Sequence, residues 1–172
     1  MAISFIRIDD RVIHGQLITR WAKEFPCEGI IAIDDGVAND PFLSQVMKGA
    51  VSDVRVWLFT LEMAIEKLAS VSASEKKYFI ISKSPVTLFQ LIEAGISLKN
   101  DRNCINVGPM SARQGTTIVG PNQSVTPQEI TAFRFLANAG YKIDFRLVPD
   151  AKSFDWATAE KKLLTVESKN DY

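Results

Sequence analysis

Cysteine and histidine are scarce in this sequence of 172 residues, which contains two cysteines and one histidine. Cys27 and Cys104 lie far apart, and their spacing matches no metal-binding motif. Because Cys104 lies within an apolar run, we expect a reduced thiol in the core and a reducing compartment. A chain of this length buries about two thirds of its unfolded surface and can fold without a disulfide or a metal ion.

Long hydrophobic runs and net charge are also missing. No apolar segment approaches the roughly 20 residues that span a bilayer, and charged residues follow Met1 too soon for a signal peptide. Twenty basic residues balance 20 acidic ones, whereas a general nucleic-acid-binding protein needs an excess of Lys and Arg. We therefore expect a cytoplasmic protein that binds no nucleic acid and acts on a membrane only from outside it.

Short apolar segments alternate with longer amphipathic ones along the chain. Gly29–Ile33 is an uninterrupted apolar run, typical of a strand that is buried on both faces. In Gly15–Glu24 the apolar residues recur at helical spacing. Strands are predicted over Ile3–Ile8, Gly29–Ile33, 54–59, 77–81, Cys104–Val107 and 142–148, with a shorter one over 117–119. Helices are predicted over Gly15–Glu24, 40–51, 85–95, 127–140 and 155–164, with a further one that begins after Thr60.

This alternation predicts an α/β fold with an open, mainly parallel sheet of about six to seven strands and helices on both faces. No repeat or linker divides the sequence, so we expect one domain over residues 1–165 and a flexible tail over residues 166–172. Trp21, Phe42 and Trp57 are expected in the core. In such sheets, binding sites form in the loops beyond the carboxyl ends of the strands.

The first of these loops reads Asp9-Asp10-Arg11-Val12-Ile13-His14-Gly15-Gln16. The imidazole of His14 can act as a nucleophile or exchange a proton at cellular pH. The unpaired amides and the dipole of the following helix favour an anion at this point. A phosphoryl group on His14 would therefore lie among backbone amides, here those of Ile13, Gly15 and Gln16.

The neighbouring residues suit the same interpretation. Arg11 could give bidentate hydrogen bonds to phosphate oxygens, and Gly15 would let the backbone approach a ligand. Asp9 or Asp10 could accept the ring N–H opposite the reactive nitrogen of His14 and fix the tautomer. Spacing alone leaves structural alternatives open: a surface histidine, aspartates that cap the turn or the helix, and an arginine that pairs with one of them.

The run Arg7-Ile8-Asp9-Asp10-Arg11-Val12-Ile13-His14-Gly15-Gln16-Leu17 closely resembles the N-terminal signature of enzyme IIB components of one group of bacterial sugar phosphotransferase systems, the mannose/fructose/sorbose family. Every fixed position of the pattern R-I-D-x-R-[LV]-[IV]-H-G-Q-[VL] matches. The resemblance extends over nearly the whole chain. Its further segments are Asp34-Asp35 with Val37-Ala38-Asn39-Asp40, Lys83-Ser84-Pro85, Ile105-Asn106-Val107-Gly108-Pro109-Met110 and Ser124-Val125.

The resemblance implies a phosphotransferase component with a phosphohistidine intermediate. His14 would accept a phosphoryl group on Nδ1 from the phosphohistidine of an enzyme IIA partner, stabilised by loop amides and Arg11. It would then pass the group to a sugar that crosses the membrane through the subunits IIC and IID. The resemblance also implies no metal or organic cofactor, a position at the inner face of the cell membrane, and a possible homo-oligomer. The sequence does not identify the sugar.

A second wall of the site is expected from the ends of other strands. Gly108 permits close approach of the backbone, and Asn106 could hold the first loop by hydrogen bonds. Arg113 could contact phosphate or a partner, or lie in solvent, and Lys83 would add positive potential. The residues predicted in this wall are Asp34, Lys83, Asn106, Gly108 and Arg113. A basic rim that meets an acidic partner is expected from Arg20, Lys23 and Lys48.

Three other interpretations are weighed against the phosphocarrier. A response-regulator receiver domain needs an aspartate at the end of its third strand, where this chain reads Leu58-Phe59-Thr60-Leu61. A histidine phosphatase needs an arginine directly before the reactive histidine and a second histidine, but Ile13 precedes His14 and no second histidine exists. A non-catalytic binding module would bury His14 without reactivity toward a phosphodonor.

Overall fold

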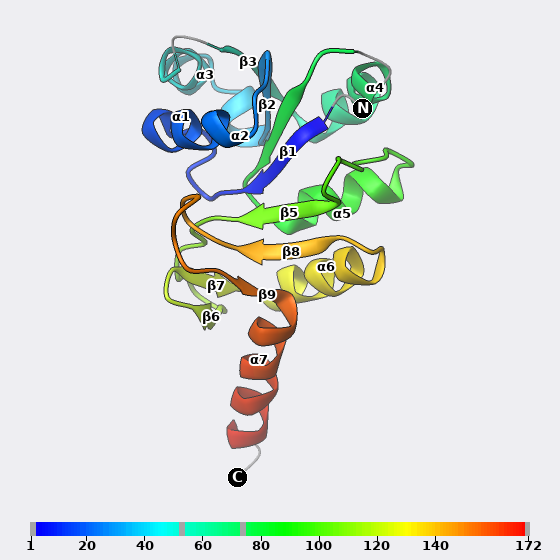
Figure 1. Cartoon of the computed structure of the whole chain (residues 1–172). Helices are drawn as coiled ribbons and strands as arrows, with labels where there is room; N and C mark the ends of the chain where they lie inside the picture. Colours follow the sequence, from blue (N-terminus) through cyan, green and yellow to red (C-terminus); the bar gives the residue numbers. More distant parts are fainter. Residues whose placement is uncertain (1–2, 52–53, 73–74, 171–172) are drawn as a thin grey trace.

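A central sheet of seven strands organises the structure (Figure 1), a computed structural model that describes residues 3–51, 54–72 and 75–170. The strand order is β3 (Arg55–Phe59), β2 (Gly29–Ile33), β4 (Tyr78–Ser82), β1 (Ile3–Ile8), β5 (Cys104–Val107), β8 (Lys142–Phe145) and β9 (Phe154–Asp155). Every neighbouring pair is parallel except β8 and β9. A separate antiparallel hairpin contains β6 (Thr117–Gly120) and β7 (Gln123–Val125). The open, mainly parallel sheet confirms the predicted fold class.

Helices cover both faces of the sheet and bury a hydrophobic cluster on each. The first cluster lies under α1 (Gly15–Glu24), α2 (Asp35–Ala38) and α3 (Pro41–Gly49). The second lies under α4 (Leu61–Ser72), α5 (Pro85–Glu93), α6 (Pro127–Asn138) and α7 (Trp156–Asn170). Side chains of β1 reach both clusters: Phe5 belongs to the first cluster, whereas Ile6 and Ile8 belong to the second. Burial on both faces explains the uninterrupted apolar runs of the central strands.

Side-chain caps determine where several helices begin. Asp40 caps α3 and Ser84 caps α5, each directly before a proline in the first turn. At α6 the predicted capping box is confirmed. The Glu129 N–H donates to the Thr126 hydroxyl at 3.2 Å, and the Thr126 N–H donates to the Glu129 carboxylate at 2.9 Å. These caps place three helix N-termini at the edge of the sheet where the parallel strands end.

Short elements escape the sequence patterns. Neither α2, β7 nor β9 is predicted, because segments of two to four residues carry too little periodicity to be recognised. The last helix continues to Asn170, beyond its predicted end at residue 164, so the segment expected to form a tail begins within α7. Flexibility over residues 166–172 stays a prediction, and residues 171–172 lie outside the described part of the chain.

The prediction that Phe42 lies in the core is wrong. Trp21 is buried as expected and Trp57 is half-buried against the second cluster, but Phe42 on α3 is 73% exposed. Helix α3 packs beside the edge strand β3 and buries none of its residues, with only Met47 partly covered by the first cluster. Its apolar residues therefore face solvent. The other large apolar side chains exposed on α3 are Leu43 and Val46.

Truncating Leu88 should test the assignment of the core. Leu88 in α5 is 0% exposed, so Leu88→Ala should lower the free energy of unfolding by about 2–5 kcal/mol in urea denaturation. Leu43→Ala is the matched control, since it makes the same change at a 39% exposed leucine in a helix of equal length. It should cost less than about 1 kcal/mol. Comparable losses would contradict the burial described for α5.

Candidate functional site

The loop between β1 and α1 folds as a tight turn. The Asp9 N–H donates to the Ser82 carbonyl at 2.9 Å, which extends the pairing of β1 with β4 by one residue. The Val12 N–H then donates back to the Asp9 carbonyl at 3.0 Å. Val12 has a φ of 61°, in the left-handed region that β-branched residues rarely adopt. Its side chain is buried in the first hydrophobic cluster, and this packing holds the residue in its strained conformation.

His14 lies at the start of α1, where it is the N-cap with extended backbone. Its side chain is exposed and makes no capping hydrogen bond. The first intrahelical bond runs from the Ile18 N–H to the His14 carbonyl at 3.0 Å, so the amides of Gly15 and Gln16 have no partner within the helix. The first turn contains no acidic residue. The ring is therefore accessible at a point that favours an anion.

Glycine is required after His14 for packing, and the predicted approach of a ligand at Gly15 stays a prediction. A Cβ on Gly15 would lie 2.3 Å from the carbonyl oxygen of Ala50, the C-cap of α3. Because this neighbour is backbone, it cannot move aside as a flexible side chain would, and only glycine lets α1 begin against the end of α3. Ile13 is buried in the first cluster on the other side of His14. His14 is therefore held between two anchored neighbours.

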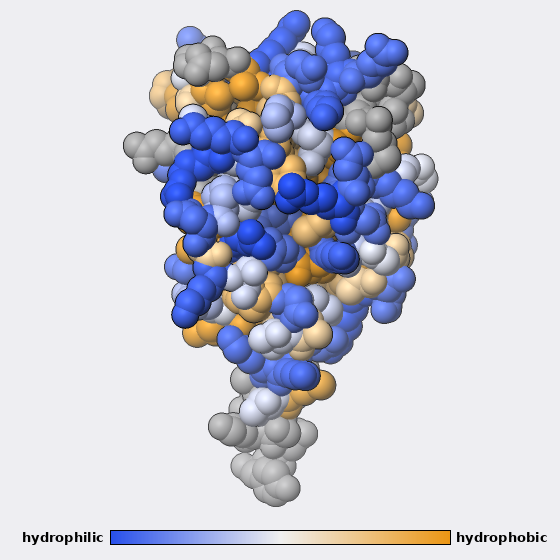
Figure 2. Space-filling model, in the orientation of Figure 1, coloured by the Kyte–Doolittle hydropathy of each residue, from blue (hydrophilic) through white to orange (hydrophobic). Residues whose placement is uncertain are grey.

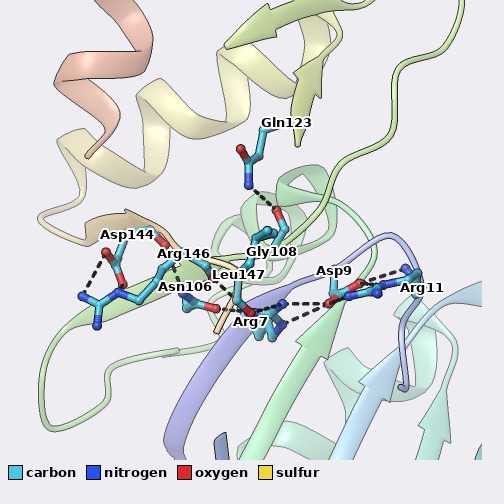
Figure 3. A network of polar contacts seen from close by, with 9 residues as sticks. All are labelled: Arg7, Asp9, Arg11, Asn106, Gly108, Gln123, Asp144, Arg146 and Leu147. Carbon is cyan, nitrogen blue, oxygen red and sulfur yellow. Dashed lines mark hydrogen bonds and ion pairs between the residues drawn. The ribbon is translucent and has the colours of Figure 1, made fainter. Parts of the chain in front are cut away.

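Arg7 and Arg11 share the carboxylate of Asp9 (Figure 3). Arg7 donates to Asp9 Oδ2 from Nε at 3.1 Å and from Nη2 at 2.9 Å. Arg11 donates to Oδ1 from its backbone N–H at 3.1 Å and from its Nε at 3.2 Å. Arg7 and Asp9 are 2% and 1% exposed, whereas 45% of the Arg11 side chain is exposed. The buried pair thus orients a second guanidinium that still faces solvent.

Strand β5 and the segment after β8 supply the remaining acceptors for the Arg7 guanidinium (Figure 3). Its Nη1 donates to the side-chain oxygen of Asn106 and, at 3.3 Å, to the Arg146 carbonyl. Its Nη2 donates to the Leu147 carbonyl at 3.3 Å. A Cβ on Gly108 would lie 2.2 Å from Nη2, so glycine is needed where this loop passes the guanidinium. Burial lowers the pKa of Arg7, and its ion pair opposes this change.

Asp10 links the loop after β5 to the loop between β1 and α1. Its N–H donates to the Pro109 carbonyl at 3.2 Å, and its Oδ2 accepts hydrogen bonds from the N–H and the hydroxyl of Ser111. Asp9 meanwhile is occupied by two arginines. Among the described residues, neither aspartate bonds to the His14 ring, which both were expected to be able to orient. Both carboxylates instead fix the loops around His14.

The other residues of the predicted second wall line a neighbouring cleft of about 600 Å³, which Asp10 of the first loop also lines. In it, Lys83 lies 4.0 Å from the Asp34 carboxylate, and Arg113 forms an ion pair at 2.7 Å with the buried Glu129. His14 is not among the residues that line this cleft. The predicted wall is therefore divided: one part supports Arg7 from behind, and the other forms a neighbouring polar cleft.

Arg20 is the member of the predicted basic rim that lies beside His14. Both residues line the same open hollow on the surface. The Arg20 guanidinium forms an ion pair with Asp150 at 2.5 Å, and both side chains are exposed. The positive charge of Arg20 is therefore partly offset within the chain. Lys23 and Lys48 are exposed but do not line this hollow.

In the described ranges 3–51, 54–72 and 75–170, neither the cysteines nor a metal-binding cluster offers a second reactive centre. Cys27 and Cys104 are free, and burial raises the pKa of both thiols, that of Cys27 to about 11. Both thiols are therefore protonated and poorly nucleophilic near neutral pH. No group of three or more His, Cys, Asp or Glu in these ranges could hold a metal ion. No helix there is long and apolar enough to cross a membrane.

Arg7 supports the site, but the sequence motif alone predicts no role for it. It lies within a largely apolar strand and has no direct access to a ligand. A signal for it does exist in the sequence, because a charged side chain within a buried strand needs a buried partner. Asp9 follows two residues later, so both side chains emerge on the same side of the extended backbone.

The comparisons with known proteins agree with one another. The family described as "PTS system sorbose subfamily IIB component" matches residues 3–171. The fructose-specific EIIB component of Bacillus subtilis (strain 168) is 31% identical over 157 residues, which cover 91% of this chain and 94% of that protein. The mannose-specific EIIAB component of Escherichia coli (strain K12) is 33% identical over 90% of this chain and 48% of that protein. The crystal structure of the IIBSor domain of the Klebsiella pneumoniae sorbose permease has a TM-score of 0.85 and 29% identity, covering 94% of this chain and 98% of that one.

Replacing Arg7 by methionine should destabilise the protein strongly, because it leaves the buried charge of Asp9 without its main partner. We expect a loss of about 3–5 kcal/mol in the free energy of unfolding, measured by urea denaturation. Arg11→Met is the matched control. It removes the exposed guanidinium from the same carboxylate and should cost less than about 1 kcal/mol.

A double variant separates the ion pair from simple packing. Arg7→Met with Asp9→Leu leaves no unpaired charge, so it should be more stable than Arg7→Met alone. If the double variant is as unstable as the single one or more so, the loss comes from packing and the ion pair is not the constraint.

Proposed function

Because this chain belongs to the sorbose subfamily of IIB components of the sugar phosphotransferase system, we propose that it is a phosphocarrier with His14 as its phosphoryl acceptor. It accepts the group from the phosphohistidine of an enzyme IIA and donates it to a sugar taken up through the membrane subunits IIC and IID. One observation carries the proposal: the sole histidine is exposed at the N-terminus of α1, with no hydrogen bond to its ring among the described residues.

The proposed transfer replaces one imidazole by another on the same phosphorus atom. A ring nitrogen of His14, assigned as Nδ1 by the family resemblance, attacks the phosphorus in line. A new N–P bond forms while that of the donor breaks, and the donor ring leaves with the electron pair. The step is nearly balanced in energy, so the protein has mainly to align the rings and stabilise spread-out charge. A sugar hydroxyl then attacks the phosphorus, loses its proton, and releases the imidazole of His14.

Donors for the phosphoryl oxygens come from the loop and from α1. The amides of Gly15 and Gln16 lie at the positive end of the helix dipole, directly after His14. Arg11 contributes a half-exposed guanidinium, whose Nε and Nη2 bond to Asp9. Its Nη1 is then the group available to a phosphoryl oxygen.

The carboxylates of the loop support a carrier rather than a hydrolase. A hydrolase needs a general base that activates water beside the phosphohistidine. Asp9 is engaged by two arginines. Asp10 accepts hydrogen bonds from Ser111 through Oδ2, and its Oδ1 is buried away from solvent, so neither carboxylate is placed to activate water. A phosphoryl group on His14 is therefore kept for transfer to a partner.

The proposal places the protein in the cytoplasm, associated with the inner face of the membrane through IIC and IID. Relatives are named as specific for fructose, sorbose, mannose and N-acetylgalactosamine, so we expect a substrate of this class. One relative is named EIIAB, which combines the IIA and IIB designations, and this supports an enzyme IIA as the partner. A homo-oligomer stays a prediction.

A phosphorylation assay tests the role of His14. Phosphoenolpyruvate, enzyme I, HPr and a mannose-family enzyme IIA should introduce acid-labile, base-stable phosphate into this chain. His14→Ala should abolish the label without changing the unfolding midpoint, because the side chain is exposed. Arg11→Gln should slow labelling about 10- to 100-fold, since it removes one charged donor. Labelling of His14→Ala, or no label from an enzyme IIA that labels another IIB protein, would contradict the proposal.

Reversing the charge of Arg20 tests the proposed docking of enzyme IIA. Arg20→Glu should slow phosphoryl transfer more at about 50 mM salt than at about 500 mM, because salt screens attraction between exposed charges. Asp150→Asn is the control, since it removes the internal ion pair but keeps Arg20, and it should not slow transfer. Equal slowing at both salt concentrations would argue against electrostatic guidance by Arg20.

A further inference from the structure

A cleft of about 1090 Å³ lies on the sheet face that α1 leaves uncovered over β5 and β8. In Figure 1 these two strands cross the front of the molecule with α5 and α6 behind them. The cleft is walled by the C-terminal half of α1, by β8 and by the start of α7. Figure 2 shows hydrophobic residues among hydrophilic ones in the middle of this face. The volume of the cleft is ample for a small ligand.

Two nitrogen donors in this cleft are buried without hydrogen-bond partners in the described part of the chain. Trp21 is 2% exposed, and its Nε1 has no acceptor. The Nε of Arg146 has none either, although it lies 3.1 Å from the Asp144 carboxylate in an ion pair. The ion pair and two further hydrogen bonds satisfy the Arg146 guanidinium. Since buried polar groups are nearly always hydrogen-bonded, the Trp21 Nε1 indicates an occupant that presents an oxygen acceptor.

The charges around the cleft are balanced, which favours a neutral occupant. The charged residues that line it are Arg102, Lys142, Arg146, Glu24, Asp144 and Asp155. A free anion would meet three carboxylates, whereas a hydroxyl group accepts from N–H donors and also donates to carboxylates. The half-buried rings of Phe25 and Phe154 offer apolar contact for C–H groups of the same molecule.

We propose that this cleft is a second, non-catalytic binding site for a polyhydroxylated small molecule, either a free sugar or the sugar part of a sugar phosphate. Its floor touches the network behind the reactive loop. The Arg7 guanidinium lies 5.6 Å from the ring centre of Trp21, and Asn106, which lines the cleft, accepts a hydrogen bond from Arg7. The site does not depend on phosphoryl transfer at His14, so its test is separate from that of the proposed function.

The three tryptophans allow a direct test by NMR. Trp21 and Trp156 line the cleft, whereas Trp57 lies on β3 at the opposite edge of the sheet. A free hexose and a hexose 6-phosphate, added separately, should shift the indole N–H signals of Trp21 and Trp156 with dissociation constants on the order of 1–10 mM. The Trp57 signal should not move, and inorganic phosphate should move none. Shifts with hexose 6-phosphate and phosphate but not with the free hexose would overturn the proposal in favour of an anion site.

Two arginines provide matched variants. Arg102 lies over the Phe25 ring at 4.3 Å and lines the cleft, whereas Arg55 lies over the Trp57 ring at 5.0 Å and does not. Arg102→Ala should weaken sugar binding about fivefold or more, and Arg55→Ala should leave it unchanged. Equal weakening by both variants would overturn the proposal.

Two further variants locate the binding. Trp21→Phe removes the N–H donor but keeps an aromatic ring, and it should weaken binding as read from the Trp156 signal. His14→Ala should bind the sugar as the native protein does, because His14 does not line the cleft. Loss of binding in His14→Ala would place the sugar at the reactive loop instead. No shift with any hexose would overturn the proposal.

Discussion

The buried ion pair between Arg7 and Asp9 is the interaction on which the geometry of the site depends. Burying two charges is costly unless their remaining hydrogen bonds are made. Here Arg7 obtains them from Asn106, Arg146 and Leu147, which lie far along the chain. Ends of β1, β5 and β8 thus converge on one guanidinium. Moving any of these segments would expose the buried charges of Arg7 and Asp9. The loop between β1 and α1 is therefore positioned by the sheet as well as by its own sequence.

Local packing then determines how His14 is presented. Val12 accepts a strained backbone because its side chain is buried, and Gly15 lies against Ala50 where no Cβ would fit. Because Ile13 is buried on one side and Gly15 packs against Ala50 on the other, the imidazole stays exposed at the helix terminus. A loop with little freedom suits transfer between two proteins, because each must present its ring in a defined direction for in-line attack.

Periodicity and cap chemistry predict the longer elements well, since both are local. The bounds of β1, α1 and β2 agree with the predicted segments, and the Thr126 capping box forms as expected. The predicted burial of Phe42 is wrong because it depends on whether another element covers α3, which no local pattern encodes. The second wall fails in part for a similar reason. Asp34 follows β2, which is separated from β1 by β4, so it reaches a neighbouring cleft. The partners of Arg7 likewise require the fold, since they lie on distant strands.

The moderate charge of the site suits the proposed phosphocarrier, which would have to give up the group that it accepts. Arg11 shares its charge with Asp9, and Arg20 shares its charge with Asp150. A cluster of unpaired cations around His14 would stabilise the phosphorylated state as much as the transition state, which would make the next transfer slower. Paired arginines and helix amides can stabilise the passing phosphoryl group without trapping it. In the proposed carrier, the internal ion pairs would help to keep acceptance from one partner and donation to the next close in energy.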